Sequence, residues 1–183
     1  MHQPSLSISR VSHDSSSSIL NGLERDELDV GVVCPPKRIS SRLKVTHRFQ
    51  DAFTLIANRD KFEEANLGLT EQKVVGKWLN QQPWLVIDEK TETGNRLKLW
   101  MRSQRFERKV LMELDNFDLL ISLVSLGLGV SIVPQRSLAL YGKKRSLLRI
   151  PWQKRFSREL VVLTRKQKNL PEHIERFIQN ILF

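Results

Sequence analysis

Serine side chains suited to binding an anion stand where the sequence predicts the start of a helix. The serine run at 15–18 comes directly before the apolar positions of 19–23, and serine is a preferred residue at a helix N-terminus. Such a terminus offers hydroxyls, unpaired backbone N–H groups and the positive end of the helix dipole, which suit a carboxylate or another anion. Ser15 and Ser16 are therefore candidate ligand-binding residues, although helix capping alone also explains serine there.

Two further pairs of candidates lie at other predicted helix starts. Thr91 and Thr93 open a helix expected over 91–101, where a threonine hydroxyl either caps the helix or binds a ligand. Asn116 can cap the helix that follows it, and Phe117 beside it belongs either to the ligand site or to the core. We expect both turns to contribute to one small-molecule site.

Three more candidates come from the N-terminal part of the chain. His13 lies next to the serine run at the edge of the expected site, although a lone histidine is more often a surface or packing residue. Cys34 and Pro35 follow a predicted strand end and could line the floor of the site, while a small buried hydrophobe is the other interpretation of Cys34. Because Cys34 is the only cysteine, an internal disulfide and a cysteine-based zinc cluster are excluded.

The sequence contains no recognisable catalytic or cofactor-binding constellation. It has no G-x-S-x-G or H-E-x-x-H motif and no phosphate-cradling glycine loop. Its four histidines are scattered, without the paired spacing of metal ligands. We therefore predict no catalytic residue, no metal and no cofactor, and a protein that is not an enzyme.

Strand and helix patterns alternate along the chain and must position these candidates. The expected helices cover 15–25, 70–81, 91–101, 116–127 and a last segment containing 174–182. The expected strands cover 5–11, 29–33, 42–48, 52–57, 84–87, 105–112, 128–133, 147–150 and 159–163. This alternation predicts an α/β fold with mostly parallel sheets covered by helices, as two units rather than one. Ligands in such sheets bind beyond the carboxyl ends of the strands, which points to the turns at 13–18, 34–37, 88–93 and 115–117.

Composition limits the environment and the partners. The chain has 183 residues, of which 40% are hydrophobic, enough for one core or two small ones. No apolar run approaches the roughly 20 residues of a membrane helix, and the N-terminus lacks a secretion pattern, so we expect a cytoplasmic protein without a membrane partner. The net charge of +10 favours nucleic acid, anionic surfaces or anionic ligands, but the basic residues are dispersed, and solvated faces also explain them.

Two stretches resemble the effector-binding domain of LysR-type transcriptional regulators. Residues 19–33 match the family's helix-to-strand segment, with Asp26 and Gly31 in place of the usual glycine and alanine. Residues 120–134 match its second helix-to-strand segment at Val124, Gly127, Leu128, Gly129 and Pro134. The Pro-Trp-Leu-Val at 83–86 and the later elements keep the family's order, so the resemblance covers about residues 4–183.

The resemblance implies a type 2 periplasmic-binding-protein-like fold, with two Rossmann-like lobes, a hinge and an effector between them. Lobe I, which is incomplete, is expected at 1–57 plus 165–183, and lobe II at 58–164 including the returning hinge strand. The candidate residues named above would face a small-molecule effector, with anions among the expected ligands. The full-length protein is expected to form a homodimer or a tetramer.

The chain departs from the family at its start. Relatives begin with a helix-turn-helix, a linker helix and the first strand and helix of lobe I, whereas by this resemblance the present sequence is expected to start at the second strand. Contact with DNA is therefore expected only through a helix-turn-helix that this chain lacks. The missing strand should expose backbone hydrogen-bonding groups on its neighbours, so we expect a fragment of a longer product or a degraded copy.

Two functions from different classes stay open at this stage. The first is an effector-sensing domain that controls transcription, and the second is a basic protein that binds DNA or RNA directly. Direct phosphate contacts predict a steep dependence of DNA affinity on salt, whereas a sensor predicts thermal stabilisation by its ligand. An enzyme on the same fold lacks an identifiable nucleophile, although fold alone does not exclude it.

Overall fold

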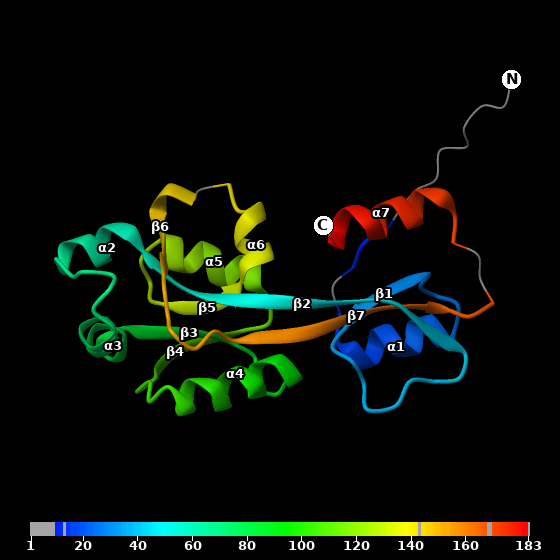
Figure 1. Ribbon diagram of the computed structural model, residues 1–183, viewed down its shortest axis with the longest axis horizontal. Coiled ribbons are helices and arrows are strands. Elements are labelled where there is room, and N and C mark those ends of the chain that lie inside the picture. Colours follow the sequence, from blue (N-terminus) through cyan, green and yellow to red (C-terminus); the bar gives the residue numbers. More distant parts are fainter. Residues whose placement is uncertain (1–9, 13, 143, 168–169, 183) are drawn as a thin grey trace, which may run out of the picture. The chain divides into compact units, whose positions relative to one another are not determined.

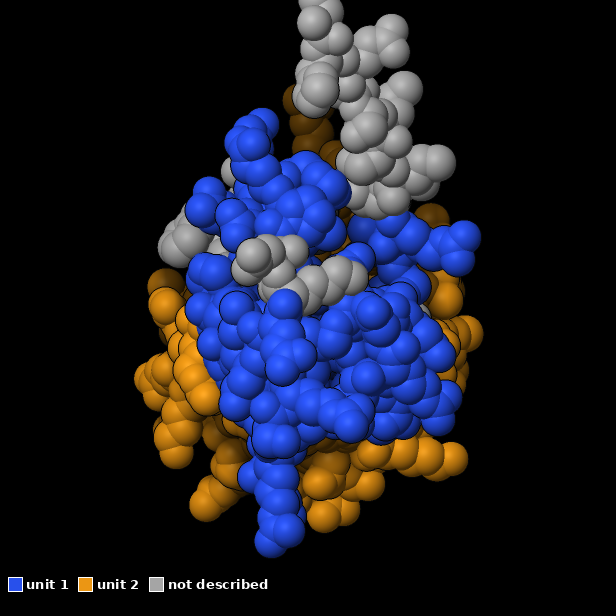
Figure 2. Space-filling view, turned by 90° about the vertical axis from the view of Figure 1, so that its right-hand side faces the viewer, with its two compact units in different colours: residues 1–47, 162–183 blue, residues 48–161 orange. Residues whose placement is uncertain are grey.

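The structure of the chain, a computed structural model, describes residues 10–12, 14–142, 144–167 and 170–182. The chain divides into unit 1, residues 1–47 and 162–183, and unit 2, residues 48–161, which Figure 2 distinguishes by colour. Two long strands, β2 (Leu43–Asn58) and β7 (Ser157–Arg165), contribute residues to both units (Figure 1). Helices and strands alternate along the chain, which confirms the predicted α/β class.

Unit 1 confirms three of the predicted elements. They are α1 (Ser16–Glu24), β1 (Val30–Val33) and α7 (Glu172–Leu182). The helix start is where the serine run predicts it, because the Ser15 Oγ accepts a hydrogen bond from the Ser18 backbone N–H at 3.1 Å. β1 pairs with β7, while most of the strand expected at 5–11 lies outside the described residues.

Arg165 fastens the turn between α1 and β1. Its guanidinium donates to the carbonyl oxygens of Leu23 at 2.9 Å and Leu28 at 2.8 Å, and it pairs with the carboxylates of Asp26 and Asp29. Asp26 has a φ of 65°, in the left-handed region that favours glycine, where the resemblance also expects glycine. Arg165 therefore stabilises a turn in which Asp26 adopts a backbone conformation that is unfavourable for aspartate.

Replacing Arg165 by alanine is expected to lower the free energy of unfolding by about 2 kcal/mol, because two carbonyls lose a charged donor. Arg176→Ala is the control, since Arg176 and Glu172 form an ion pair whose side chains are 68% and 83% exposed. That exposed pair should contribute less than about 0.5 kcal/mol. Urea unfolding measures the free energy of unfolding of both variants. Equally small decreases in the two would show that Arg165 does not stabilise the turn.

Unit 2 holds most of the secondary structure. Its remaining elements are α2 (Arg59–Glu64), α3 (Gln72–Gln81), β3 (Pro83–Ile87), α4 (Glu92–Ser103), β4 (Lys109–Leu114), α5 (Phe117–Ser125), β5 (Ser131–Pro134), α6 (Gln135–Leu140), a 3₁₀ turn (Lys144–Ser146) and β6 (Leu147–Ile150). β5 and β6 both pair antiparallel with β2, whereas β3 and β4 pair parallel. The expectation of mostly parallel pairing is therefore wrong for β2, whose partners β5 and β6 run against it.

Several element boundaries differ from the sequence prediction. The two strands expected at 42–48 and 52–57 form the single strand β2, which continues through the charged residue Asp51. β4 begins later than expected, because Arg105 has a φ of 60° and belongs to the turn that ends α4. Two six-residue helices, α2 and α6, were not predicted, since segments this short carry little periodicity.

The core of unit 2 is rich in aromatic side chains. Trp84 on β3 is fully buried, and its indole N–H donates to the Leu79 carbonyl at 3.2 Å. Ring-to-ring contacts continue from Trp84 through Phe106, Trp100 and Phe156, with neighbouring centroids 5.5 to 6.1 Å apart. In the part of the chain that the structure describes, no helix is long and apolar enough to cross a membrane.

Candidate functional site

A partly buried charge pair joins β2 and β7 in unit 2. Asp51 on β2 is 2% exposed, and its Oδ2 accepts from the Nε of Arg158 on β7 at 3.0 Å and lies 2.9 Å from Nη2. The Arg158 Nη1 donates to the Thr93 Oγ1 at 2.8 Å. One arginine thus links the two long strands to the first turn of α4.

Two aromatic rings complete this group. The Arg158 Cζ lies 5.2 Å from the ring centroid of Phe53 and 5.7 Å from that of Phe117. The two rings contact each other edge to face, with centroids 5.7 Å apart. Stacking of a guanidinium on aromatic faces holds its plane in one orientation. We call Asp51, Phe53, Thr93, Phe117 and Arg158 the Arg158 cluster.

The electrostatic surroundings of Arg158 combine charges of both signs. Thr93 belongs to the first turn of α4 and Phe117 is the first residue of α5, so two helix N-termini lie next to Arg158. The partial positive charges of these termini add to the guanidinium, whereas the acidic residues Glu92 and Asp118 in the same turns oppose them. Among the described residues, none donates a hydrogen bond to the buried Oδ1 of Asp51.

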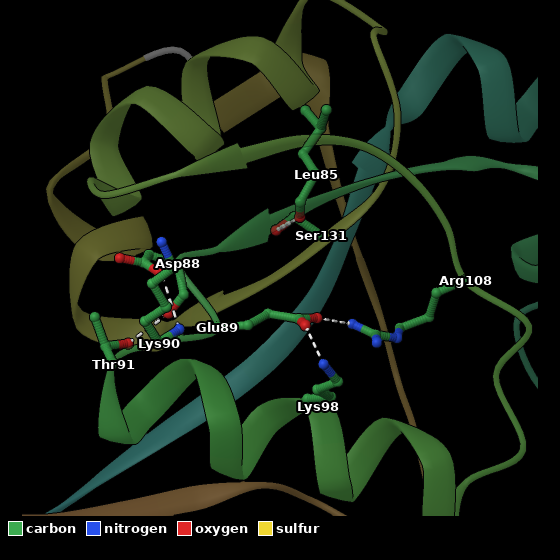
Figure 3. A network of polar contacts seen from close by, with 8 residues as sticks. All are labelled: Leu85, Asp88, Glu89, Lys90, Thr91, Lys98, Arg108 and Ser131. Atoms are coloured by element: carbon green, nitrogen blue, oxygen red, sulfur yellow. Dashed lines mark hydrogen bonds and ion pairs between the residues drawn. The ribbon is translucent and has the colours of Figure 1, made fainter.

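Hydrogen bonds among Asp88, Lys90 and Thr91 hold the turn between β3 and α4 (Figure 3). Thr91 caps α4, because its Oγ1 accepts from the Gly94 N–H at 3.0 Å and donates to the Asp88 carbonyl at 2.6 Å. The Asp88 carboxylate accepts from the Lys90 backbone N–H at 2.8 Å. These bonds set the entry angle of α4 and so the place of the Thr93 hydroxyl.

Glu89 in the same turn is clamped by two basic side chains. Its carboxylate pairs with Lys98 on α4 at 2.6 Å and with Arg108 just before β4 (Figure 3). Partial burial disfavours its ionised form, but the hydrogen bonds and charges of Lys98 and Arg108 outweigh burial and lower the pKa of Glu89. The turn, α4 and β4 are thereby joined through one ionised carboxylate.

Glu89→Gln is expected to remove an acid-sensitive part of the stability. Because the pKa of Glu89 is lower in the folded than in the unfolded chain, its contribution is complete above the unfolded value and is lost as pH falls through the folded value. At pH 7 the variant should be less stable by about 1 kcal/mol, and the difference should shrink towards pH 3. Denaturant unfolding at several pH values measures this gap, with the exposed Glu64→Gln as control. A gap that stays constant with pH would contradict the clamp.

Comparison with known proteins identifies the family. The sequence matches the LysR substrate binding domain over residues 2–182, which is nearly the whole chain. The chain belongs to the LysR substrate-binding domain family. No curated protein sequence matches it closely enough to count as a relative.

Solved structures of LysR regulatory domains share the fold. The regulatory domain of CcmR from Synechocystis PCC6803, in complex with 2-PG, aligns with a TM-score of 0.65 at 18% identity, covering 92% of this chain and 78% of that one. The apo regulatory domain of HypT from Salmonella typhimurium gives 0.70 at 12% identity, covering 98% and 83%. The effector binding domain of QuiR, in complex with shikimate, gives 0.62 at 12%, covering 92% and 77%. The LysR domain described here therefore has the type 2 periplasmic-binding-protein-like fold.

Two of the predicted site residues meet in unit 2 of this LysR domain. Thr93 and Phe117 both contact Arg158. Thr91 and Asn116 are the N-caps of α4 and α5, and the Asn116 Oδ1 accepts from the N–H groups of Asp118 and Leu119. A capping role thus accounts for the side-chain oxygens of Thr91 and Asn116.

The other predicted site residues belong to unit 1 or lie outside the described residues. Ser15 caps α1, and Ser16 is the first residue of that helix, both with exposed side chains. Cys34 and Pro35 directly follow β1, with Cys34 buried and Pro35 half-buried. His13 is not among the described residues. Their joint contribution to one ligand site, and the expected cleft between lobes, stay predictions.

Asp51 and Arg158 are not among the site residues predicted from the sequence. In the sequence, Arg158 follows the basic residues Lys154 and Arg155, which are exposed on the loop before β7, and nothing local distinguishes it from them. A usable signal was present in β2, because Asp51 shares the inward face of Phe53 and Leu55 at a spacing of two. A carboxylate at an inward strand position requires a cationic partner, which tertiary structure supplies.

Proposed function

We propose that this chain is the effector-sensing domain of a LysR-type transcriptional regulator, and that it binds a small organic anion at the Arg158 cluster. Membership of the LysR substrate-binding domain family supports the sensing role. Two of the structural neighbours add support, because they are complexes with small molecules, 2-PG and shikimate. A sensing role also accounts for the lack of recognisable catalytic motifs in the sequence. The observation that carries the ligand chemistry is the arginine held between two helix N-termini.

Arg158 has hydrogen-bonding capacity left for an anion. A guanidinium carries five N–H donors, and Asp51 and Thr93 engage three of them. Asp51 uses only its Oδ2 for two of these contacts. The pair is therefore not the bidentate arrangement in which both carboxylate oxygens accept hydrogen bonds from the guanidinium. The side chain is 17% exposed, which leaves part of it accessible to a ligand.

An effector at this site can act on a regulator only through a difference in affinity. It must bind one arrangement of the protein more tightly than another to shift the population between them. Asp51 and Arg158 lie on β2 and β7, the two strands that contribute to both units, and Thr93 lies on α4. A ligand at Arg158 would therefore contact a residue of β7 directly. Its binding free energy could then favour one arrangement of these long strands over another.

A thermal-shift screen with small carboxylates and phosphorylated acids tests this function. At least one anion should raise the melting temperature in proportion to the logarithm of its concentration. Arg158→Lys keeps the charge but loses the planar fork, so affinity should fall by about tenfold or more. Arg48→Lys is the matched control, because Arg48 also pairs across β2 and β7, with Glu159, but is 53% exposed. Equal binding by both variants would rule out Arg158 as the anion site.

Direct binding of nucleic acid is the alternative, favoured by the net charge of +10. Several of the basic side chains are engaged within the chain, however, including Lys98, Arg108, Arg158 and Arg165. A direct binder would show DNA affinity that falls steeply with salt and needs no ligand. The sensing function predicts negligible DNA binding by this chain at 150 mM salt, roughly the physiological ionic strength.

A further inference from the structure

One carboxylate oxygen of Asp51 has no hydrogen-bond donor among the residues that the structure describes. The Oδ2 atom accepts from the Arg158 Nε at 3.0 Å and lies 2.9 Å from Nη2, whereas the buried Oδ1 receives no hydrogen bond from any of these residues. An ionised carboxylate has about four acceptor positions, and buried polar atoms in folded proteins are nearly always hydrogen-bonded. Oδ1 is therefore an acceptor that a bound molecule can use.

The side chains of the Arg158 cluster direct their donors to other atoms. The Arg158 Nε and Nη2 both face Oδ2, and its Nη1 donates to the Thr93 Oγ1 at 2.8 Å. Phe53 and Phe117, whose rings lie against the guanidinium, carry no polar side-chain atom. None of these contacts satisfies Oδ1.

An anion bound to Arg158 would lie beside this carboxylate. The N–H groups that Asp51 and Thr93 leave unengaged are one on Nη1 and one on Nη2. An anion that accepts from Nη2 shares that nitrogen with Asp51. The χ2 torsion of aspartate is broad and roughly two-fold, so the carboxylate can turn to present its unsatisfied oxygen to a donor on the ligand.

The charge of Asp51 discriminates between anions at this position. Two negative groups on one guanidinium repel each other, and the repulsion is strongest where water is excluded. The Asp51 side chain is 3% exposed, so water screens the repulsion poorly. An acid that carries acceptors alone is therefore disfavoured. An acid with a hydroxyl or ammonium group next to its carboxylate can instead donate to Asp51.

We propose that Asp51 is a specificity-determining residue that accepts a hydrogen bond from the effector, so that the effector is a hydroxy acid or an amino acid. This inference rests on the proposed function, because it requires that an anion binds at Arg158. It adds to that function the chemical group that the ligand must carry beside its negative charge. Arg158 would hold the acidic group, and Asp51 would reject acids that lack a donor.

Two sets of matched acids test the inference on the wild-type chain by isothermal titration calorimetry. The sets are succinate, malate and free aspartic acid, and propionate, lactate and alanine. Within each set the carbon skeleton is constant, and the position beside a carboxylate bears hydrogen, a hydroxyl or an ammonium group. A donor-bearing member should bind about tenfold or more tightly than the donor-free member, as expected for a hydrogen bond to a charged group. The hydroxyl and ammonium members distinguish the two kinds of donor.

The Asp51→Asn variant tests whether Asp51 causes this preference. The amide keeps the shape of the side chain but removes its charge, so succinate and propionate should bind more tightly than they bind the wild type, and the preference should fall severalfold. Glu159→Gln is the matched control, because Glu159 is the residue next to Arg158 but its side chain is 36% exposed and pairs with Arg48. The control should keep the wild-type preference. Circular dichroism melting curves of both variants establish that they are folded at the temperature of the titrations.

The outcomes separate this inference from the proposed function. If Arg158→Lys weakens binding while donor-bearing and donor-free acids bind equally well, the anion site stands and the role of Asp51 is refuted. A preference that Asp51→Asn leaves unchanged refutes it as well, and so does a wild-type chain that binds none of the six acids. The proposed function itself fails only if no anion, phosphorylated acids included, binds in a way that depends on Arg158.

Discussion

Gly94→Ala is expected to destabilise the chain by about 3 kcal/mol or more, because the new methyl group has no space. A Cβ on Gly94 would lie 2.7 Å from the carbonyl carbon of Asp88 and 2.9 Å from the Cα of Glu89, with the Asp88 oxygen closer still. These are backbone atoms in the turn that enters α4, so they cannot move aside as a flexible side chain would. Relief requires a shift of α4, which also displaces Thr93 from Arg158.

Gly68→Ala is the matched control for this substitution. Its Cβ would meet only side-chain oxygens, of Glu71 at 3.7 Å and Thr70 at 4.0 Å, which is ordinary contact. The control should change stability by less than about 0.5 kcal/mol, as is usual for surface positions. Chemical denaturation compares the two variants, and a Gly94→Ala protein as stable as the control would show that the turn is looser than described.

Asp51→Leu is expected to cost about 3–5 kcal/mol, because it leaves the partly buried Arg158 without its counter-charge. The Asp51 side chain is 3% exposed and that of Arg158 is 17% exposed, so water replaces the lost partner poorly. The double variant Asp51→Leu/Arg158→Leu should regain most of this loss, since an apolar pair next to Phe53 and Phe117 suits these surroundings.

The exposed pair Arg48–Glu159, on the same two strands, is the reference for this cycle. Its side chains are 53% and 36% exposed, and its coupling energy should stay below about 1 kcal/mol. Urea titrations of the four proteins in each cycle give the two coupling energies. Equal coupling in the two cycles would mean that the Arg158 cluster is solvated and has no special electrostatic role.

Local patterns in the sequence predicted most elements of the fold. Caps account for much of this success, because Ser15, Thr91 and Asn116 each accept a hydrogen bond from the first turn of the predicted helix. Gly127 also has the positive φ of 79° that ends α5. These are interactions between residues close in sequence, which spacing and residue type specify.

The errors arise where distant residues decide the structure. Asp51 interrupts an apolar run and suggests a break between two strands, but Arg158, 107 residues away, neutralises it and β2 continues. The α2 helix is short, and its cap, the Asn58 Oδ1 that accepts from the Lys61 N–H, was the one local sign of it.

The candidate site was predicted in part for the same reason. Thr93 and Phe117 were found because helix starts are visible in sequence and two such starts converge on one place. Arg158, the cation that both residues contact, was not predicted as part of the site. It directly precedes the strand predicted at 159–163, where a basic residue is usually exposed to solvent. Burial of Arg158 depends on β2, α4 and α5 together, and no local pattern reports that arrangement.

A crystal structure of the chain with whichever anion most raises its melting temperature tests the proposed effector site most directly. The expected result is an anionic oxygen of the ligand within hydrogen-bonding distance of the Arg158 guanidinium, with Thr93 and Phe117 beside it. A ligand bound without any contact to Arg158, or a chain that no anion stabilises, would contradict it.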